Sequence, residues 1–221
     1  MPDLYDLCIM LNGDPVIMCD MHSFTRKSRV HRGRIRTPDS SSQWLTLPVQ
    51  KDDRRKRLPE VRLDSTVNWP REWMKQLTFC YSASTYFDHF EEQIYADFRY
   101  AASHTYLTGA TFFLFNRIRQ YLEIPEISLI PASGLDEWDE DPDQLIRNLG
   151  ANHLFQEHRS RHYLRQAENR VDPDVRFPRY NQSGQGFKSW CCWLDLLFEY
   201  GPESFKIIDQ LYNGVRGKVT K

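Results

Sequence analysis

Two short apolar runs constrain the fold of this chain more than any other feature of its sequence. Val16–Cys19 comes directly after Pro15, and Glu126–Ile130 is stopped by Pro131. Val16–Cys19 is short and has no alternating polar residues, which is typical of a strand buried on both faces of a parallel sheet. Glu126–Ile130 is expected to be another short strand of the parallel type. Segments with apolar residues at helical spacing separate and follow these runs. The order predicts an α/β fold with a mostly parallel sheet that is flanked by helices.

Spacing and capping signals place helices along most of the chain. The helices are expected at Leu4–Leu11, Trp69–Cys80, Thr85–Ala102, Leu107–Leu122, Pro142–Leu149, Ser160–Asn169, Ser189–Tyr200 and Glu203–Tyr212. Further short strands are expected at His153–Phe155 and Val175–Phe177.

An antiparallel β insertion is expected near the N-terminus. His31–Arg36 and Trp44–Val49 have the composition of strands, and the turn-rich segment Thr37–Ser42 joins them. Leu58–Leu63 is expected to be a third strand of this region.

The length of 221 residues fits one large domain or two small ones. We expect one domain over residues 1–221, made of an antiparallel β region (28–64), a helical region (69–122) and an α/β part with the C-terminal helices (123–221). An α/β unit normally has a strand before its first helix, so we also expect the first strand to be missing.

The cysteine content favours a reducing compartment. The five cysteines are an odd number, none forms a CxxC pair, and most lie within apolar runs. The first six residues do not resemble a signal peptide, and no apolar run approaches the roughly 18 residues that span a bilayer. A cytoplasmic protein without a membrane span is therefore expected.

Charge is segregated along the chain although the net charge is −1. Residues 22–57 contain 11 Lys/Arg and 3 Asp/Glu, whereas residues 123–143 contain 8 Asp/Glu and no Lys/Arg. This separation predicts one cationic and one anionic surface.

The cationic segment contains a dense group of basic residues within eleven positions: Arg26, Lys27, Arg29, Arg32, Arg34 and Arg36. Side chains alternate along a strand, so Arg32, Arg34 and Arg36 would share one face. Several guanidinium groups on one face form a good receptor for phosphate or carboxylate. The alternative is a solvated edge strand whose charges prevent pairing with another sheet.

Polar residues follow several of the predicted strands. In open α/β sheets, ligands bind beyond the carboxyl ends of the strands. The residues expected at these ends are Asp20, His22, Ser133, Gln156 and Tyr180.

Asp195 lies within the strongly apolar segment Trp193–Phe198. An unpaired carboxylate in such surroundings is costly. Asp195 is therefore either on a surface face of its helix or the buried partner of one of the arginines, and we favour the buried partner.

These features occur as motifs along nearly the whole chain, from about Leu4 to about Tyr212. The C-terminal motif consists of Tyr180, Gln182, Gly186, Phe187, Asp195-Leu-Leu-Phe198 and Gly201. The N-terminal motifs consist of Val16–Asp20, Lys27-Ser28 with Arg32 and Ile35, and Trp44-Leu-Thr-Leu-Pro-Val49. Together they resemble the pattern of the WbqC-like protein family.

The resemblance implies a bacterial enzyme of surface-polysaccharide (O-antigen) or related biosynthesis, with glycine or other acyl transfer proposed for some members. The chain departs from the family pattern in three places. It lacks the opening Gln-Pro-x-Tyr-x-Pro strand, has Gln156-Glu157 where Ser-Gly is usual, and has Thr111 where Asn is usual. These departures keep open a non-catalytic binding or scaffold protein, a degenerate member of the family.

The resulting hypothesis is a group-transfer enzyme, of the acyl, aminoacyl or glycosyl type. Its substrate would be an anionic activated small molecule, such as a nucleotide sugar or an acyl or aminoacyl donor. The candidate catalytic residues are Asp20, His22 and Asp195. The candidate substrate-binding residues are Arg26, Lys27, Arg29, Arg32, Arg34, Tyr180 and Gln182.

The sequence gives less support to a metal site or a nucleic-acid site. His158 and His162 would share a helix face, but Arg159 and Arg161 between them indicate an exposed basic face, so no metal site is predicted. The basic run Arg54–Arg57 could contact nucleic acid, but the near-neutral net charge and the lack of an RNA-binding motif argue against it. The sequence predicts no particular cofactor and no oligomeric state.

Overall fold

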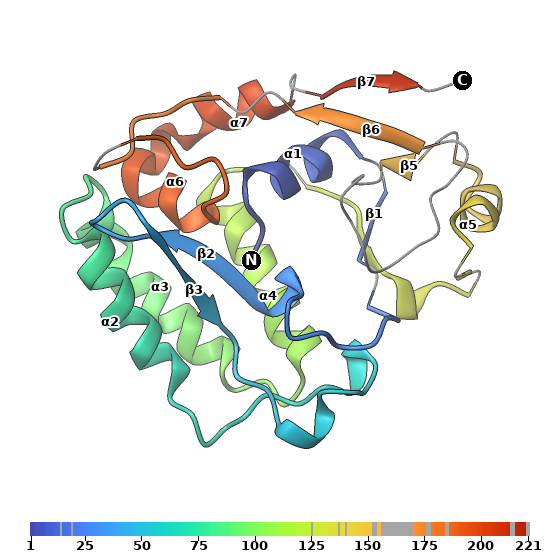
Figure 1. Ribbon diagram of the computed structural model, residues 1–221, viewed down its shortest axis with the longest axis horizontal. Helices are drawn as coiled ribbons and strands as arrows, with labels where there is room; N and C mark the ends of the chain where they lie inside the picture. Colours follow the sequence, from blue (N-terminus) through green and yellow to red (C-terminus); the bar gives the residue numbers. More distant parts are fainter. Residues whose placement is uncertain are drawn as a thin grey trace.

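Figure 1 shows the computed structural model, in which helices and short strands are mixed. The structure describes residues 1–13, 15–18, 20–124, 126–136, 138–139, 141–151, 154–155, 170–175, 178–183, 186–212 and 215–219. The predicted helix Ser160–Asn169 lies outside these residues, as do Gln156, His158 and His162.

The α-helices confirm most of the predicted ones to within a few residues. They are α1 (Leu4–Asn12), α2 (Trp69–Tyr81), α3 (Phe87–Ala101), α4 (Leu107–Tyr121), α5 (Pro142–Asn148), α6 (Trp193–Tyr200) and α7 (Phe205–Tyr212). α6 is shorter than expected, because it begins at Trp193 rather than at Ser189. Among the described residues, no helix has the length and apolar character needed to cross a bilayer.

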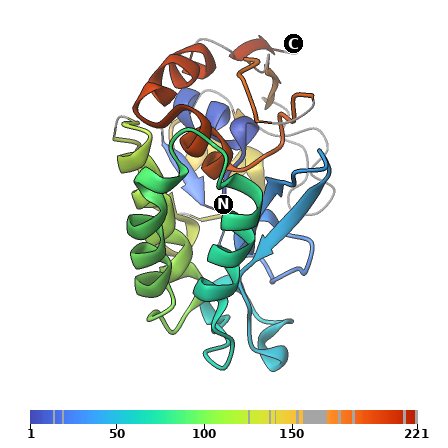
Figure 2. The same cartoon turned by 90° about the vertical axis from the view of Figure 1, so that its left-hand side faces the viewer.

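α2, α3 and α4 lie side by side in both views (Figures 1 and 2). Trp69, Trp73 and Leu77 recur every four residues on α2 and are buried. Both tryptophan rings pack against Phe98 of α3, at centroid distances of 5.7 and 5.2 Å. The apolar stripe that predicted α2 from the sequence is therefore the surface that holds this layer together.

The strands are β1 (Val16–Met18), β2 (Arg32–Arg36), β3 (Ser42–Thr46), β4 (Leu129–Pro131), β5 (Leu154–Phe155), β6 (Arg170–Val175) and β7 (Val215–Val219). Within the described part of the chain they form three small sheets rather than one mostly parallel sheet. β1 pairs with β4 in parallel, β2 with β3 antiparallel, and β6 with β5 in parallel and β7 antiparallel. The α/β character is confirmed and the mostly parallel sheet is not.

The first two predicted strands of the antiparallel region are confirmed. In the β2–β3 hairpin, Arg34 lies opposite Trp44 and Arg32 lies opposite Thr46. The predicted third strand at Leu58–Leu63 is confirmed only at its end, where Leu63 forms an isolated antiparallel bridge with Val49, because Leu58–Glu60 is a 3₁₀ turn, η3. Pro59 fixes a turn-compatible φ and provides no N–H for a strand ladder, and the Val61 N–H closes the turn on the Leu58 carbonyl at 3.2 Å.

The C-terminal segment before α6 packs between the N-terminus and β2. The Cys192 N–H donates to the Arg34 carbonyl at 2.7 Å, and Cys192 also forms an isolated bridge with Asp3. From Trp193 to Phe198 every residue of α6 is buried. This position brings the C-terminal motif against the arginine-bearing strand β2.

Candidate functional site

A buried carboxylate in the first turn of α6 joins three segments of the chain. Asp195 is 0% exposed. Its Oδ1 accepts a hydrogen bond from the Tyr81 hydroxyl at 2.9 Å. Its Oδ2 accepts hydrogen bonds from the Tyr180 hydroxyl at 2.8 Å and from Gln182 Nε2 at 2.7 Å. Both carboxylate oxygens are therefore occupied by side chains from α2 and from the loop before α6.

Arg36, at the end of β2, provides the positive charge of this buried network. Its Nη2 lies 2.8 Å from Glu199 Oε1, and its Nε lies 3.5 Å from Asp195 Oδ1. Glu199 also accepts hydrogen bonds from Ser84 and from the backbone and side chain of Ser183. The prediction that Asp195 is the buried partner of an arginine is confirmed.

Burial decides the proton positions in the network. Burial raises the pKa of Asp195, and the hydrogen bond from Tyr180 and the charge of Arg36 oppose that rise. Burial, followed by the charge of Asp195, also raises the pKa of Tyr81 and of Tyr180 well above the usual value. Both phenols therefore keep their protons and remain donors to the carboxylate.

Arg32 and Arg34 lie on the same strand but stack on tryptophans. Their guanidinium carbons lie 4.1 and 4.5 Å from the centroid of the Trp44 ring. Arg34 also lies 4.6 Å from the centroid of Trp190. Neither arginine forms an ion pair with a carboxylate of the described chain, so their charge is not neutralised there.

A stacked guanidinium keeps its hydrogen-bond donors available. All of its N–H groups lie in the plane of the group, whereas a stacking ring covers a face of that plane. An anion can therefore reach the N–H groups at the edges of the Arg32 and Arg34 guanidinium groups, while Trp44 and Trp190 contact the faces of these groups. One edge is already in use, because Arg32 Nη2 donates to the Lys27 carbonyl at 2.5 Å.

Gln182 links the buried network to this surface. Its Nε2 donates to the Lys188 carbonyl at 3.1 Å, and its Oε1 accepts from the Lys188 N–H at 2.7 Å. The Lys188 ammonium lies 5.8 Å from the centroid of Trp190. We call the resulting group the cationic platform; it consists of Arg32, Arg34, Lys188, Trp44 and Trp190.

The other basic residues of the segment do not join the platform. Arg29 lies 3.0 Å from Asp6 and 3.5 Å from Asp3, so it anchors the start of α1. Arg26 and Lys27 are exposed in the loop that precedes the 3₁₀ turn η1 (Arg29–His31).

Asp20 and Ser133, which were both predicted to follow strands, meet where β1 and β4 end. Asp20 is 2% exposed. It accepts the Ser133 N–H at 2.8 Å and the Ser133 hydroxyl at 2.5 Å. No hydrogen bond or ion pair joins Asp20 to a described arginine. His22 lies edge-on to Trp138, with ring centroids 6.2 Å apart.

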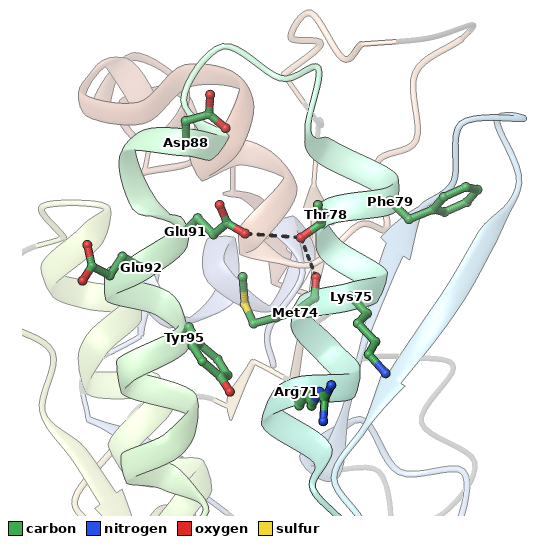
Figure 3. A pocket seen from close by; sticks show the side chains of 9 residues that line it. All are labelled: Arg71, Met74, Lys75, Thr78, Phe79, Asp88, Glu91, Glu92 and Tyr95. Carbon is green, nitrogen blue, oxygen red and sulfur yellow. Dashed lines mark hydrogen bonds between the residues drawn. The ribbon is translucent and has the colours of Figure 1, made fainter.

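An open groove of about 860 Å³ lies between α2 and α3 (Figure 3). Asp88, Glu91 and Glu92 of α3 line one side of it, and Arg71 and Lys75 of α2 line the other. No residue of the sequence-predicted site lies in this groove. Among the described residues, no three His, Cys, Asp or Glu side chains come together in a way that could hold a metal ion.

Sequence reasoning missed the aromatic half of the platform and most of the buried network. The predicted hairpin could have identified Trp44. If the turn lies near Pro38–Ser40, strand pairing places Trp44 close to Arg34 on the neighbouring strand. Lys188 and Trp190 give no comparable signal, because only the tertiary fold brings them to β2. Arg36 was expected to share the open face, but the structure buries it beside Glu199.

The model of the WbqC-like protein family matches residues 7–207. An uncharacterized protein of Mycobacterium tuberculosis, Rv1507c, is 28% identical over 209 residues, which cover 86% of each chain. No solved structure matches the chain significantly.

Proposed function

The chain belongs to the WbqC-like protein family, and from that membership and the site geometry we propose that it is a group-transfer enzyme. Its anionic activated substrate binds at the cationic platform through phosphate or carboxylate oxygens. The reaction is of the acyl, aminoacyl or glycosyl type, in surface-polysaccharide or related small-molecule biosynthesis.

One observation carries this proposal: the Arg34 guanidinium lies over two indole rings, those of Trp44 and Trp190, without a carboxylate partner in the described chain. A guanidinium held in this way loses little further conformational freedom when it binds an anion. A forked, fixed donor group suits the two oxygens of a phosphate or carboxylate.

The candidate catalytic residues take different roles in the proposal. Asp195 has no exposure and both of its oxygens are occupied, so we assign it, with Tyr180 and Gln182, to positioning Lys188 and Trp190. Asp20 and His22 remain the candidates for proton transfer, since they lie beyond the end of β1.

Calorimetric titration with nucleotide sugars, coenzyme A and nucleoside diphosphates tests the anion site. Arg34→Gln is expected to weaken binding of the best ligand by about tenfold or more, because it removes a charged hydrogen-bonding partner. Arg34→Lys keeps the charge but loses the planar fork, and an intermediate affinity is expected.

Arg99→Gln is the matched control, because it removes one exposed cation from α3. An Arg34→Gln protein that binds like Arg99→Gln would rule out the platform as the anion site. Binding without turnover of any acceptor would instead favour the alternative, a non-catalytic member of the family.

A further inference from the structure

Two basic loops meet at one end of the molecule. Ser23 forms an isolated antiparallel bridge with Arg57, and the Phe24 N–H donates to the Lys56 carbonyl at 2.8 Å. The Leu58 N–H donates to the His22 carbonyl at 3.0 Å. This pairing brings two stretches of exposed cations together, and we call them the basic edge: Arg26, Lys27, Arg54, Arg55 and Arg57.

These five cations differ from Lys56 and Arg62 of the same region, which form ion pairs with a buried carboxylate. Asp53 is 0% exposed and pairs with Lys56 at 2.6 Å and with Arg62 at 2.8 Å. These ion pairs with a buried residue fix the loop that contains Asp53 and Lys56. The five cations of the basic edge form no ion pair with any residue that the structure describes, and Asp52 and Glu60 are the exposed acids of the same loop. Cations are therefore in excess on this surface.

Exposed apolar side chains lie at the same end. Tyr106 is 49% exposed and forms an isolated bridge with Arg62, and Val67 is 42% exposed in the loop that leads into α2. The 3₁₀ turns η2 (Lys51–Asp53) and η3 and the start of α2 lie at the lower end of the molecule in both views (Figures 1 and 2).

This combination fits one kind of partner best. Clustered Lys and Arg side chains are attracted to anionic lipid headgroups, and tyrosine and aliphatic side chains are stabilised at the boundary between headgroups and acyl chains. A nucleic acid would use the cations but would leave Val67 without a favourable contact. We infer that the basic edge docks on an anionic bilayer surface, with Tyr106 and Val67 entering the headgroup layer.

Co-sedimentation of the full chain with vesicles tests this inference. Binding is expected to vesicles of phosphatidylglycerol mixed with phosphatidylcholine, to weaken as salt is raised, and to be absent with phosphatidylcholine alone. Arg54→Gln with Arg55→Gln is expected to weaken binding about 30-fold, from about 1 kcal/mol per cation. Val67→Ser is expected to weaken it as well.

The matched control is Arg147→Gln with Lys206→Gln, which makes the same charge change on α5 and α7. This control is expected to bind like the wild type, and 10 mM inorganic phosphate is not expected to release the protein. Equal binding by the two double variants would overturn the inference. So would tighter binding to a 20-nucleotide DNA than to anionic vesicles, or retention of binding on phosphatidylcholine alone.

Discussion

Asp195→Ala is expected to lower the free energy of unfolding by about 3–5 kcal/mol, the range for removing one partner of a buried charged network. The substitution leaves the hydroxyls of Tyr81 and Tyr180 and the amide of Gln182 without their shared acceptor. It also leaves Arg36 with Glu199 as its remaining carboxylate partner. Urea unfolding followed by circular dichroism and by tryptophan fluorescence measures the change.

Two further variants test whether the loss of stability comes from the buried carboxylate of Asp195 in particular. Asp195→Asn keeps the shape but replaces one acceptor oxygen by a donor, and it is expected to be destabilising for that reason. Glu203→Ala removes an exposed acid that pairs with Lys206, and a change below about 1 kcal/mol is expected. A free energy for Asp195→Ala within 1 kcal/mol of the wild type would show that the network contributes little to stability.

Gly201→Ala is expected to destabilise the fold by about 3 kcal/mol or more, because backbone strain and a steric clash act together. Gly201 ends α6 with φ 51° and ψ −127°, a conformation that side chains other than glycine rarely adopt. An added Cβ would lie 2.5 Å from the ring of Tyr86. The backbone that carries this ring is fixed, because the Tyr86 N–H donates to the Phe198 carbonyl at 2.9 Å.

Thermal and urea unfolding of Gly201→Ala can be compared with those of Gly134→Ala. At Gly134 an added Cβ would lie 3.4 Å from Pro131, an ordinary contact, and a change within about 1 kcal/mol is expected. Adding Tyr86→Ala to Gly201→Ala is expected to remove the clash but not the backbone strain. Equal stabilities of the two glycine variants would refute the close approach at Gly201.

Local patterns in the sequence predicted the elements of the fold well. Apolar spacing located α2, α3 and α4, and β-strand alternation correctly placed Arg32 and Arg34 on one face. The error at Leu58–Glu60 arose because Val61 and Leu63, two positions apart, match the alternation of a strand, and this alternation does not show that the segment begins with a turn. Pro59 was the residue that could have decided between a strand and a turn.

The candidate site was harder to predict because its contacts join distant parts of the chain. Arg36 and Glu199 are 163 residues apart, and Tyr81 and Asp195 are 114 apart. The periodicity of residues within a single helix or strand cannot predict contacts between residues so far apart in the sequence. The cost of an unpaired buried carboxylate did predict that Asp195 needs a cationic partner, but it could not select Arg36 from the neighbouring arginines.

The sheet arrangement shows the same limit. The apolar runs predicted β1 and β4, and Asp20 and Ser133 lie beyond the ends of these strands as predicted. Neither run contains information about how many further strands pair with it. The side chains of β1 and β4 are half-buried rather than fully buried, as expected for strands in a two-stranded sheet.

Fluorine NMR of protein labelled with 5-fluorotryptophan tests directly whether the anion binds at the cationic platform. The chain has six tryptophans, and Trp44→Phe and Trp190→Phe assign the two resonances of the platform. On titration with uridine diphosphate or pyrophosphate, these two resonances are expected to shift together, while those of Trp69 and Trp73, buried between α2 and α3, stay in place. Binding that leaves the Trp44 and Trp190 resonances unmoved, or that shifts the Trp138 resonance beside His22 instead, would contradict the assignment of the anion site to the cationic platform.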